Sequence, residues 1–466
     1  MATLYILAIG GSGARVVRSL AMLLPTLPNF GRFSEVKPVL IDADEKNGSL
    51  DRAGNILSYY ENLNSNAELS SSGYFKTKIE KHDNKYIHLV DVRNNNSSKF
   101  EDYIDLTTLK KNDNNTARLI ELLFSGKSSA GTELLDLDMD VGFQGNPNIG
   151  SVVMSDWAEG FLSKMTLQST DEVLFITSIF GGTGAAGFPA FLSRMRKADK
   201  ENPKTNEAEL TGVKMGAISL LPYYGLPEKK SSSELDGSHF IPKTKSALNY
   251  YLGNIYTNEK GDRLKEFKKS DIEYFCYIAH EYIAKQPKNE RGGKSGSKEK
   301  TQDNPAFFAE LMAALAVLDY VTETLERGKI KFKQIADIKS NTVPITVDNT
   351  IHLDEKIASQ IKGHLIKLSL ISKILNKEFL KKSIDKKYAW TKNLNITKAI
   401  DENLVKFFAE YEEWKTNLKT YGQKFNSPEV NVSGYEIHTK LDRLSKNSSS
   451  KGIGALVGIL NKMEIV

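Results

Sequence analysis

Two apolar runs that end in glycine mark the most regular parts of this sequence. Residues 4–9 read LYILAI and lead into GGSGAR at 10–15, and residues 173–179 read VLFITSI and lead into FGGTGAAGFP at 180–189. An apolar run of this length predicts a buried strand. Residues 16–24 and 191–196, which follow the two turns, have apolar spacing typical of helices. The pattern therefore predicts strand, glycine turn and helix twice in one chain.

Each glycine turn has the composition of an anion-binding loop. Glycines let backbone N–H groups approach a phosphate, and a helix N-terminus adds partial positive charge. The candidate phosphate-binding residues are Gly10, Gly11, Ser12, Gly13, Gly181, Gly182, Thr183 and Gly184. Arg15 and Arg18 are the cations near the first turn, where Arg15 either contacts phosphate or is solvated on the first helical turn. The alternative for both turns is a glycine-rich connection that binds nothing.

Two common nucleotide-binding motifs do not match this sequence. A dinucleotide fingerprint that starts at Gly11 has Val16 in place of its third glycine, so close packing of helix on strand is not predicted. A Walker loop that ends in Gly293-Lys294-Ser295 has Lys288 in place of its first glycine. Both mismatches argue against these two classes of nucleotide site.

Both turns resemble the tubulin/FtsZ superfamily. Residues 181–184 are similar to the core of its GGGTG(S/T)G signature, with Phe180 in place of the first glycine and Pro189 at the position of the FtsZ proline. Residues 10–15 are similar to the tubulin loop GQCGNQ, with Ser12 at the Cys and Ala14 at the nucleotide-contacting Asn. The resemblance implies GTP or GDP, with proximal phosphates at the first loop and distal phosphates at the second.

The resemblance extends to two further candidate sites. LIDAD at 40–44 is similar to the second-strand VDLE of tubulin, and Asp42 and Asp44 offer the hard oxygen ligands that Mg²⁺ prefers; the alternative is a helix cap or a solvated turn. NPAFFAELMAALAVL at 304–318 predicts a long apolar helix with Pro305 in its first turn. It resembles the family's central helix, which implies that Asn304 reads the base; we favour a helix cap for Asn304.

One stretch departs from the family. The loop after the central helix carries an acidic residue in tubulin and FtsZ, whereas residues 328–334 read GKIKFKQ here. Lysines stabilise phosphate charge but do not orient an attacking water as a carboxylate does. Asp337 is the nearest downstream carboxylate and the one catalytic candidate. The alternative for this stretch is a solvated strand edge whose lysines prevent aggregation.

The sequence divides into two predicted domains. Residues 1–327 form the nucleotide-binding domain, with expected surface insertions at about 48–150 and at 285–302. At the end of the first insertion, residues 142–150 are a candidate third loop over the terminal phosphate or an ordinary turn. Residues 152–165, which follow it, predict a helix. Residues 328–466 are expected to be mainly helical, with an apolar segment at 453–460 that docks on its own domain or on a neighbouring subunit.

Composition adds three expectations. The chain has 466 residues, 40% of them hydrophobic, and a net charge of +5, so we expect two or three domains and no nucleic-acid surface. The single Cys, Cys276, is expected to be a buried core residue. The first apolar run lacks a basic flank and no segment is long enough to span a membrane, so we expect a cytoplasmic protein.

The sequence therefore predicts an α/β protein with a Rossmann-like parallel sheet of the tubulin/FtsZ type and a helical C-terminal region. The expected function is binding of GTP with Mg²⁺, whose nucleotide state controls self-assembly into an oligomer or filament, with slow GTP hydrolysis as one possibility. The first alternative is a nucleotide-bound adaptor that does not hydrolyse, for example in bacterial defence, with a partner at the C-terminal helices. An NAD-dependent oxidoreductase is the second alternative.

Overall fold

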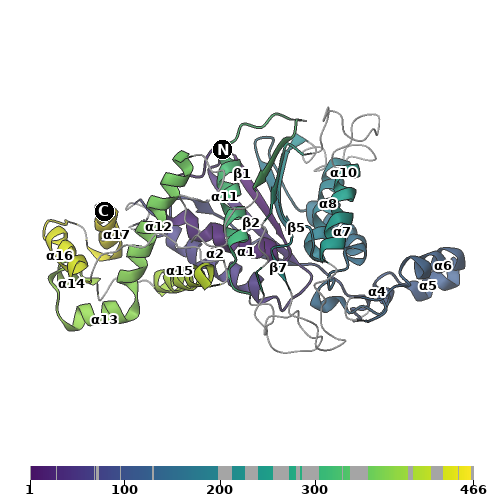
Figure 1. The fold of residues 1–466 in the computed structure, drawn as a ribbon, viewed down its shortest axis with the longest axis horizontal. Coiled ribbons are helices and arrows are strands. Elements are labelled where there is room, and N and C mark those ends of the chain that lie inside the picture. The colour runs from purple at the N-terminus through teal and green to yellow at the C-terminus, as the bar shows by residue number, and fades with distance from the viewer. Residues whose placement is uncertain are drawn as a thin grey trace.

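A parallel β-sheet with helices on both faces forms the centre of the protein, as Figure 1 shows for the computed structural model of the chain. The structure describes residues 2–27, 29–67, 69, 73–94, 96–128, 131–197, 212–225, 240–254, 272–279, 284–285, 304–327, 329–335, 355–396, 402–420, 434–449 and 451–462. The predicted α/β class with a parallel sheet is confirmed.

Within the residues that the structure describes, the sheet has eight strands and every pair in it is parallel. In chain order they are β1 (Thr3–Ile9), β2 (Glu35–Asp42), β3 (Lys78–Ile79), β4 (Ile87–Leu89), β5 (Glu172–Ser178), β6 (Lys214–Leu220), β8 (Tyr274–Ile278) and β10 (Lys331–Ile335). Their order across the sheet is β10-β8-β6-β5-β1-β2-β3, and β4 also pairs with β2. The chain thus builds one side of β1 first and then returns to build the other side.

Both faces of the sheet are buried, which explains the continuous apolar runs of its strands. Positions 4, 6 and 8 of β1 belong to one hydrophobic core, and positions 5, 7 and 9 belong to the other. The first core is covered by α1 (Gly10–Leu23), α2 (Gly48–Asn64) and α11 (Phe308–Thr322). The second is covered by α7 (Pro147–Leu162), α8 (Thr183–Lys197) and α10 (Phe240–Asn254). Each buried Leu or Ile contributes roughly 1.5–3 kcal/mol.

The expected surface insertion at 48–150 is wrong for its first part. The Asn47 side chain accepts a hydrogen bond from the Ser49 N–H and so caps α2, whose residues Leu57 and Tyr60 are buried in the core. β3 and β4 extend the sheet itself. The apolar positions of α2 have helical spacing, but short polar segments separate them and obscure the pattern.

A helical arm is the part of this region that projects from the body, at the far right of Figure 1. It contains α4 (Phe100–Tyr103), α5 (Leu106–Asn112) and α6 (Asn114–Leu123). The outer surface of α6 exposes Leu119, Leu122 and Leu123. The second expected insertion, 285–302, lies outside the described residues except for Lys285 of β9 (Ala284–Lys285), which pairs with β7 (Tyr224–Gly225).

The C-terminal region is mainly helical in its described residues, as predicted. Its helices are α12 (Glu355–Leu375), α13 (Lys377–Asp385), α14 (Ala389–Asn393), α15 (Glu402–Thr420), α16 (Gly434–Ser445) and α17 (Gly452–Lys462). The predicted boundary after residue 327 falls before β10, which pairs with β8 in the central sheet. The α/β unit therefore extends at least to Ile335.

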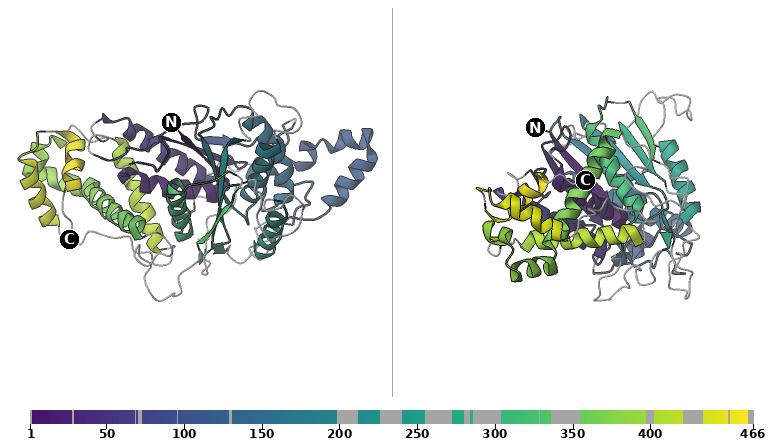
Figure 2. Two further views of the ribbon diagram at one scale, coloured as in Figure 1. Left: turned by 90° about the horizontal axis from the view of Figure 1, so that it is seen from above. Right: turned by 60° about the vertical axis from the view of Figure 1, so that its left-hand side comes forward.

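Helix α15 joins the C-terminal region to the α/β unit. The Trp414 Nε1–H donates a hydrogen bond to Ser19 Oγ on α1 over 3.0 Å, and both side chains are completely buried. The Arg18 Nη2 lies 3.2 Å from Glu410 Oε2. Helices α12 and α15 share one hydrophobic core with α1 and α11. Helices α13, α14, α16 and α17 lie beyond them and extend the same core (Figure 2).

The predicted apolar segment at 453–460 forms most of α17 and docks on its own chain. Leu456, Val457 and Leu460 are buried in the same core. Cys276 of β8 is fully buried, as predicted. Among the helices of the described residues, none combines the length and the apolar character that crossing a membrane requires.

Candidate functional site

The two glycine turns meet at the carboxyl ends of adjacent strands. β1 ends at Ile9 and α1 begins at the next residue, while β5, its parallel neighbour, ends shortly before α8. Gly10 has a φ of +81°, and a Cβ placed on it would lie 3.3 Å from the backbone N of Gly184. A side chain at position 10 is therefore disfavoured by both backbone conformation and space. The two turns are in direct contact, as the hypothesis of one shared site requires.

This meeting point is the topological switch point of the sheet. From β1 the chain crosses through α1 to β2 on one side, whereas from β5 it crosses through α8 to β6 on the other side. The N-termini of α1 and α8 both lie at this edge, so backbone N–H groups and the positive ends of two helix dipoles converge there. Ligands of open α/β sheets bind in the crevice outside the carboxyl ends of the strands at such a point.

The candidate third loop also reaches this edge. A Cβ on Gly182 would lie 3.0 Å from Phe143 Cβ and 3.1 Å from the backbone N of Gly145. A Cβ placed on Gly142 would lie 3.6 Å from Asp44 Cβ, so Gly142 lies against Asp44. Residues 142–146 precede α7 and thus pack between the second glycine turn and the end of β2.

Two of the predicted phosphate-binding glycines serve packing. A Cβ on Gly13 would lie 2.7 Å from the carbonyl oxygen of Ile176, so Gly13 lets α1 approach β1 and β5 closely. Because Val16 occupies the position of the third fingerprint glycine, close packing of this helix on the strand was not predicted. That expectation is wrong, because Gly13 permits the close packing. A Cβ placed on Gly184 would likewise lie 2.7 Å from Thr177 Oγ1. Gly11 approaches Asn47 and Gly181 approaches Ser178, so these two glycines also lie against neighbouring side chains at the meeting point.

Asp42 and Asp44 form a buried carboxylate pair beside the turns. Asp42 ends β2 and accepts hydrogen bonds from Thr183 Oγ1 over 2.8 Å and from Asn47 Nδ2 over 2.9 Å. Burial raises the pKa of Asp42. Burial and the nearby charge of Asp42 raise the pKa of Asp44 to about 7. Both side chains are at most 3% exposed, so the solvated-turn alternative is wrong, and Asn47 rather than either aspartate caps α2.

These carboxylates fit Mg²⁺ in the way that a magnesium nucleotide uses protein ligands. Mg²⁺ is commonly bound through one or two carboxylates together with phosphate oxygens and water. A cation would offset the unfavourable burial of two carboxylates. Nowhere in the described part of the chain do three or more His, Cys, Asp or Glu side chains gather as metal ligands. Asp42, Asp44 and the Thr183 hydroxyl therefore suit a metal that arrives with phosphates.

Arg15 is directed into the protein interior. Its Nε lies 2.5 Å from Glu310 Oε1, and the two side chains are 3% and 0% exposed. Arg15 Nη2 also donates to Tyr223 Oη over 2.7 Å and to Ser12 Oγ over 3.3 Å. The solvated alternative for Arg15 is therefore wrong. Its position on α1 makes it a link between the first glycine turn and α11.

Sequence reasoning missed Glu310. The signal was a single carboxylate inside the apolar run 304–318, because a buried charge requires a partner. Glu310 Oε2 accepts a hydrogen bond from the Phe307 N–H over 3.0 Å and so caps α11. The helix begins at Phe308, so the expected cap at Asn304 and first-turn position of Pro305 are wrong. Asn304 is buried, at 4% exposed, in the extended segment before the helix.

Aromatic side chains surround Phe180, the residue that stands in place of the first glycine of the tubulin/FtsZ signature. Phe180 is 1% exposed and packs edge-on against Tyr223 and Tyr224, with ring centroids 5.8 and 5.5 Å away. Tyr224 in turn lies parallel to Phe307, 5.9 Å between centroids. The bulky residue at position 180 thus belongs to an aromatic cluster that joins the second glycine turn to the start of α11.

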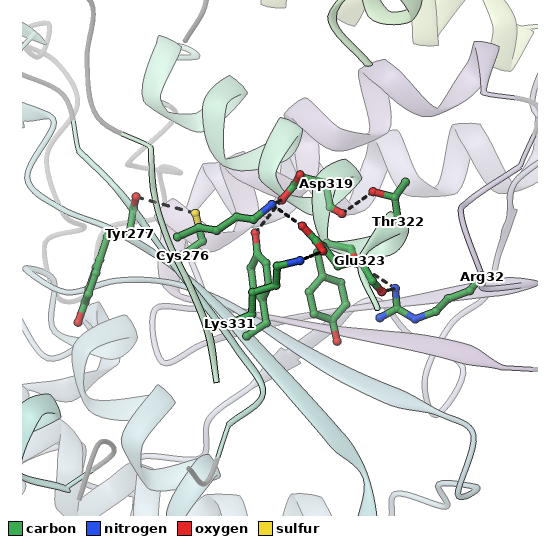
Figure 3. A network of polar contacts seen from close by, with 10 residues as sticks. Arg32, Cys276, Tyr277, Asp319, Thr322, Glu323 and Lys331 are labelled. Carbon is green, nitrogen blue, oxygen red and sulfur yellow. Dashed lines mark hydrogen bonds and ion pairs between the residues drawn. The ribbon is translucent and has the colours of Figure 1, made fainter. Parts of the chain in front are cut away.

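The basic stretch after α11 is an edge strand held by ion pairs. Lys331 and Lys333 of β10 contact Glu323, and Lys333 also contacts Asp319. Figure 3 shows Lys331 directed toward Glu323 near the C-terminal end of α11, with Arg32 on the other side of Glu323. These lysines are therefore paired rather than simply solvated. Asp337, the catalytic candidate, lies outside the described residues.

A scan against models of known protein families and a search of curated proteins each found no match. The fold and the site thus define the class of this protein: an α/β protein with a doubly covered parallel sheet and paired glycine turns at its switch point.

Proposed function

We propose that this protein binds a magnesium nucleoside triphosphate between its two glycine turns. The observation that carries the proposal is the contact between Gly10 and Gly184 at the switch point, beside the buried pair Asp42 and Asp44. Two helix N-termini supply donors and positive potential to phosphates. Burial makes the charged form of these carboxylates unfavourable. The Mg²⁺ that arrives with the nucleotide offsets this cost.

The turns have distinct roles in this proposal. Gly10, Gly11 and Ser12 contact the proximal phosphates, and Gly181, Gly182 and Thr183 contact the distal ones. Asp42 and Asp44 hold Mg²⁺, which neutralises phosphate charge. Gly13 and Gly184 keep the helices close enough to the strands for the backbone amides to converge. Arg15 acts by holding the first turn to α11 through Glu310.

GTP is the proposed nucleotide because of the tubulin/FtsZ resemblance of the turns, with Asn304 as the candidate base-reading residue. In that reading the bound nucleotide controls self-assembly in the cytoplasm. A nucleotide-bound adaptor is the second candidate. The paired lysines of β10, which follow α11 where the family carries an acidic residue, favour it over rapid hydrolysis.

The test measures binding of GTP, ATP and NAD to the full chain by calorimetry, with and without Mg²⁺, and follows phosphate release and light scattering. We expect Mg²⁺-dependent GTP binding. Turnover that rises with protein concentration supports an assembling GTPase, and binding without release supports the adaptor. A preference for NAD, or no nucleotide binding, would contradict the proposal.

A matched pair of glycine variants locates the site. Gly182→Val places a side chain against Phe143 and Gly145, so we expect nucleotide affinity to fall by at least about tenfold. Gly160→Val introduces the same change on α7, where a Cβ meets no atom within 4 Å, and should leave affinity unchanged. Equal affinities of the two variants would mean that the nucleotide binds elsewhere.

A further inference from the structure

A second constellation, far along the sequence from the glycine turns, surrounds His438 of α16. The imidazole lies between two parallel aromatic rings, with centroids 3.7 Å from Tyr388 and 4.8 Å from Phe379, each at an interplanar angle of 8°. Trp390 Nε1–H donates a hydrogen bond to His438 Nδ1 over 3.1 Å. Both ring faces and one nitrogen of His438 are therefore occupied.

The other nitrogen of His438 is left as a donor. Because Nδ1 accepts from Trp390, the proton of the neutral ring is on Nε2. Burial lowers the pKa of His438, which favours this neutral form. His438 is 9% exposed, and in the described part of the chain Nε2 has no hydrogen-bond partner. This N–H retains contact with solvent at the surface of a pocket, so water or a ligand can complete it.

A pocket of about 410 Å³ adjoins this ring edge. Its lining comprises Tyr388, His438, Thr439, Asp442, Arg443 and Lys446. His438 and Asp442, and likewise Thr439 and Arg443, are four residues apart on α16, so these two pairs lie along one face of the helix, and Lys446 follows directly after the helix ends.

The charges in the pocket are unbalanced. Asp442 Oδ1 already accepts a hydrogen bond from the Trp390 backbone N–H over 2.7 Å. Arg443 and Lys446 have no ion-pair partner within the described ranges. Two unpaired cations and a fixed N–H donor therefore border one cavity, which is the donor set that phosphate groups require.

We propose that this pocket binds a small phosphate monoester. His438 Nε2–H, the Arg443 guanidinium and the Lys446 ammonium contact the phosphoryl oxygens, and the Tyr388 ring contacts the organic part. The volume lies in the range of small-molecule sites and exceeds the size of inorganic phosphate, which favours an organic ester. The site belongs to the C-terminal helices and is independent of the nucleotide proposed for the glycine turns.

The experiment titrates the full chain with glucose 6-phosphate and with inorganic phosphate at physiological salt. Calorimetry gives affinity, and the indole N–H resonance of Trp390, identified with Trp390→Phe, reports events at His438. We expect both anions to shift this resonance and the sugar phosphate to bind more tightly. Arg443→Gln/Lys446→Gln should weaken binding by at least about tenfold.

Three further variants separate binding from folding and from the glycine turns. Lys440→Gln removes the same charge from another face of α16 and should change affinity less than about twofold. Gly182→Val should leave this binding intact. His438→Phe keeps the aromatic stack but removes the donor, and should weaken binding. If millimolar phosphate leaves the Trp390 resonance unmoved, or if the double variant binds as the unmodified protein does, the proposal is wrong.

Discussion

The guanidinium of Arg15 and the carboxylate of Glu310 form an ion pair 2.5 Å long with both side chains almost completely buried. Arg15 stands on α1 just behind the first glycine turn, and Glu310 caps α11. The pair therefore fixes the first turn of one helix against the start of another, at the edge of the sheet where we propose that the nucleotide binds.

Removing one member of this pair should be strongly destabilising. Glu310→Gln leaves the Arg15 charge buried without its partner, so we expect the free energy of unfolding to fall by about 3–5 kcal/mol. Arg15→Met/Glu310→Met removes both charges and should be less destabilised than Arg15→Met or Glu310→Met alone. Urea unfolding of the unmodified protein, Glu310→Gln, the two single Met variants and the double variant measures this. Additive effects of the two substitutions would mean that the ion pair contributes no coupling.

Asp44 is expected to lower stability in the absence of ligand while supporting metal binding. In the unmodified protein the Lys46 N–H donates a hydrogen bond to Asp44 Oδ1 over 3.0 Å. Asp44→Asn keeps this acceptor and removes a buried charge near Asp42. Near neutral pH we therefore expect it to raise the free energy of unfolding, on the order of 2 kcal/mol. It should also abolish much of the Mg²⁺ dependence of nucleotide binding. Asp91→Asn, at an exposed carboxylate, is the control for both measurements.

The contact between Trp414 and Ser19 should couple the C-terminal region to α1. Trp414→Phe leaves the buried Ser19 hydroxyl without its donor, so we expect a loss of about 1–3 kcal/mol. Adding Ser19→Ala removes the orphaned hydroxyl and should recover part of that loss. A thermal-unfolding double-mutant cycle measures the coupling, and a value near zero would mean that the two helices are held by other contacts.

His88 should make the protein sensitive to mild acid. Burial and the neighbouring His82 lower the pKa of His88 to about 4, so the folded state holds the neutral ring, and among the described residues its Nε2 has no hydrogen-bond partner. The unfolded chain takes up the proton near pH 6.5, so the free energy of unfolding falls as pH drops below about 6.5 toward about 4, by at most about 3 kcal/mol. Urea unfolding at several pH values tests this, since His88→Phe should flatten the dependence. An unchanged slope in the variant would point to other groups.

Sequence reasoning succeeded where the decisive interactions are local. The apolar runs before Gly10 and Gly181 predicted buried strands, and the structure confirms both. The contact between the two turns follows from the parallel pairing of β1 and β5. By contrast, Glu310 and Trp414 find their partners 295 and 395 residues away. No local pattern carries such information, because tertiary packing alone brings these side chains together.

Errors in the sequence reading had specific causes. Helix α2 was taken for surface because polar residues interrupt its apolar positions. The start of α11 was placed too early because Asn304 and Pro305 are typical of helix N-termini, whereas the Glu310 carboxylate caps the helix from inside its first turn. The packing role of Gly13 was not predicted, because a sequence does not reveal which glycine faces the strands.

The lone cysteine has a practical consequence. Cys276 is fully buried in β8, between two neighbouring strands of the sheet, so it should react slowly with maleimides or spin labels. A thiol introduced at an exposed position, such as Leu122 on the arm or Lys446 beside His438, would therefore carry the only readily labelled group. Distances between such probes, measured by electron paramagnetic resonance or fluorescence transfer, could then follow the molecule in solution without prior removal of a native thiol.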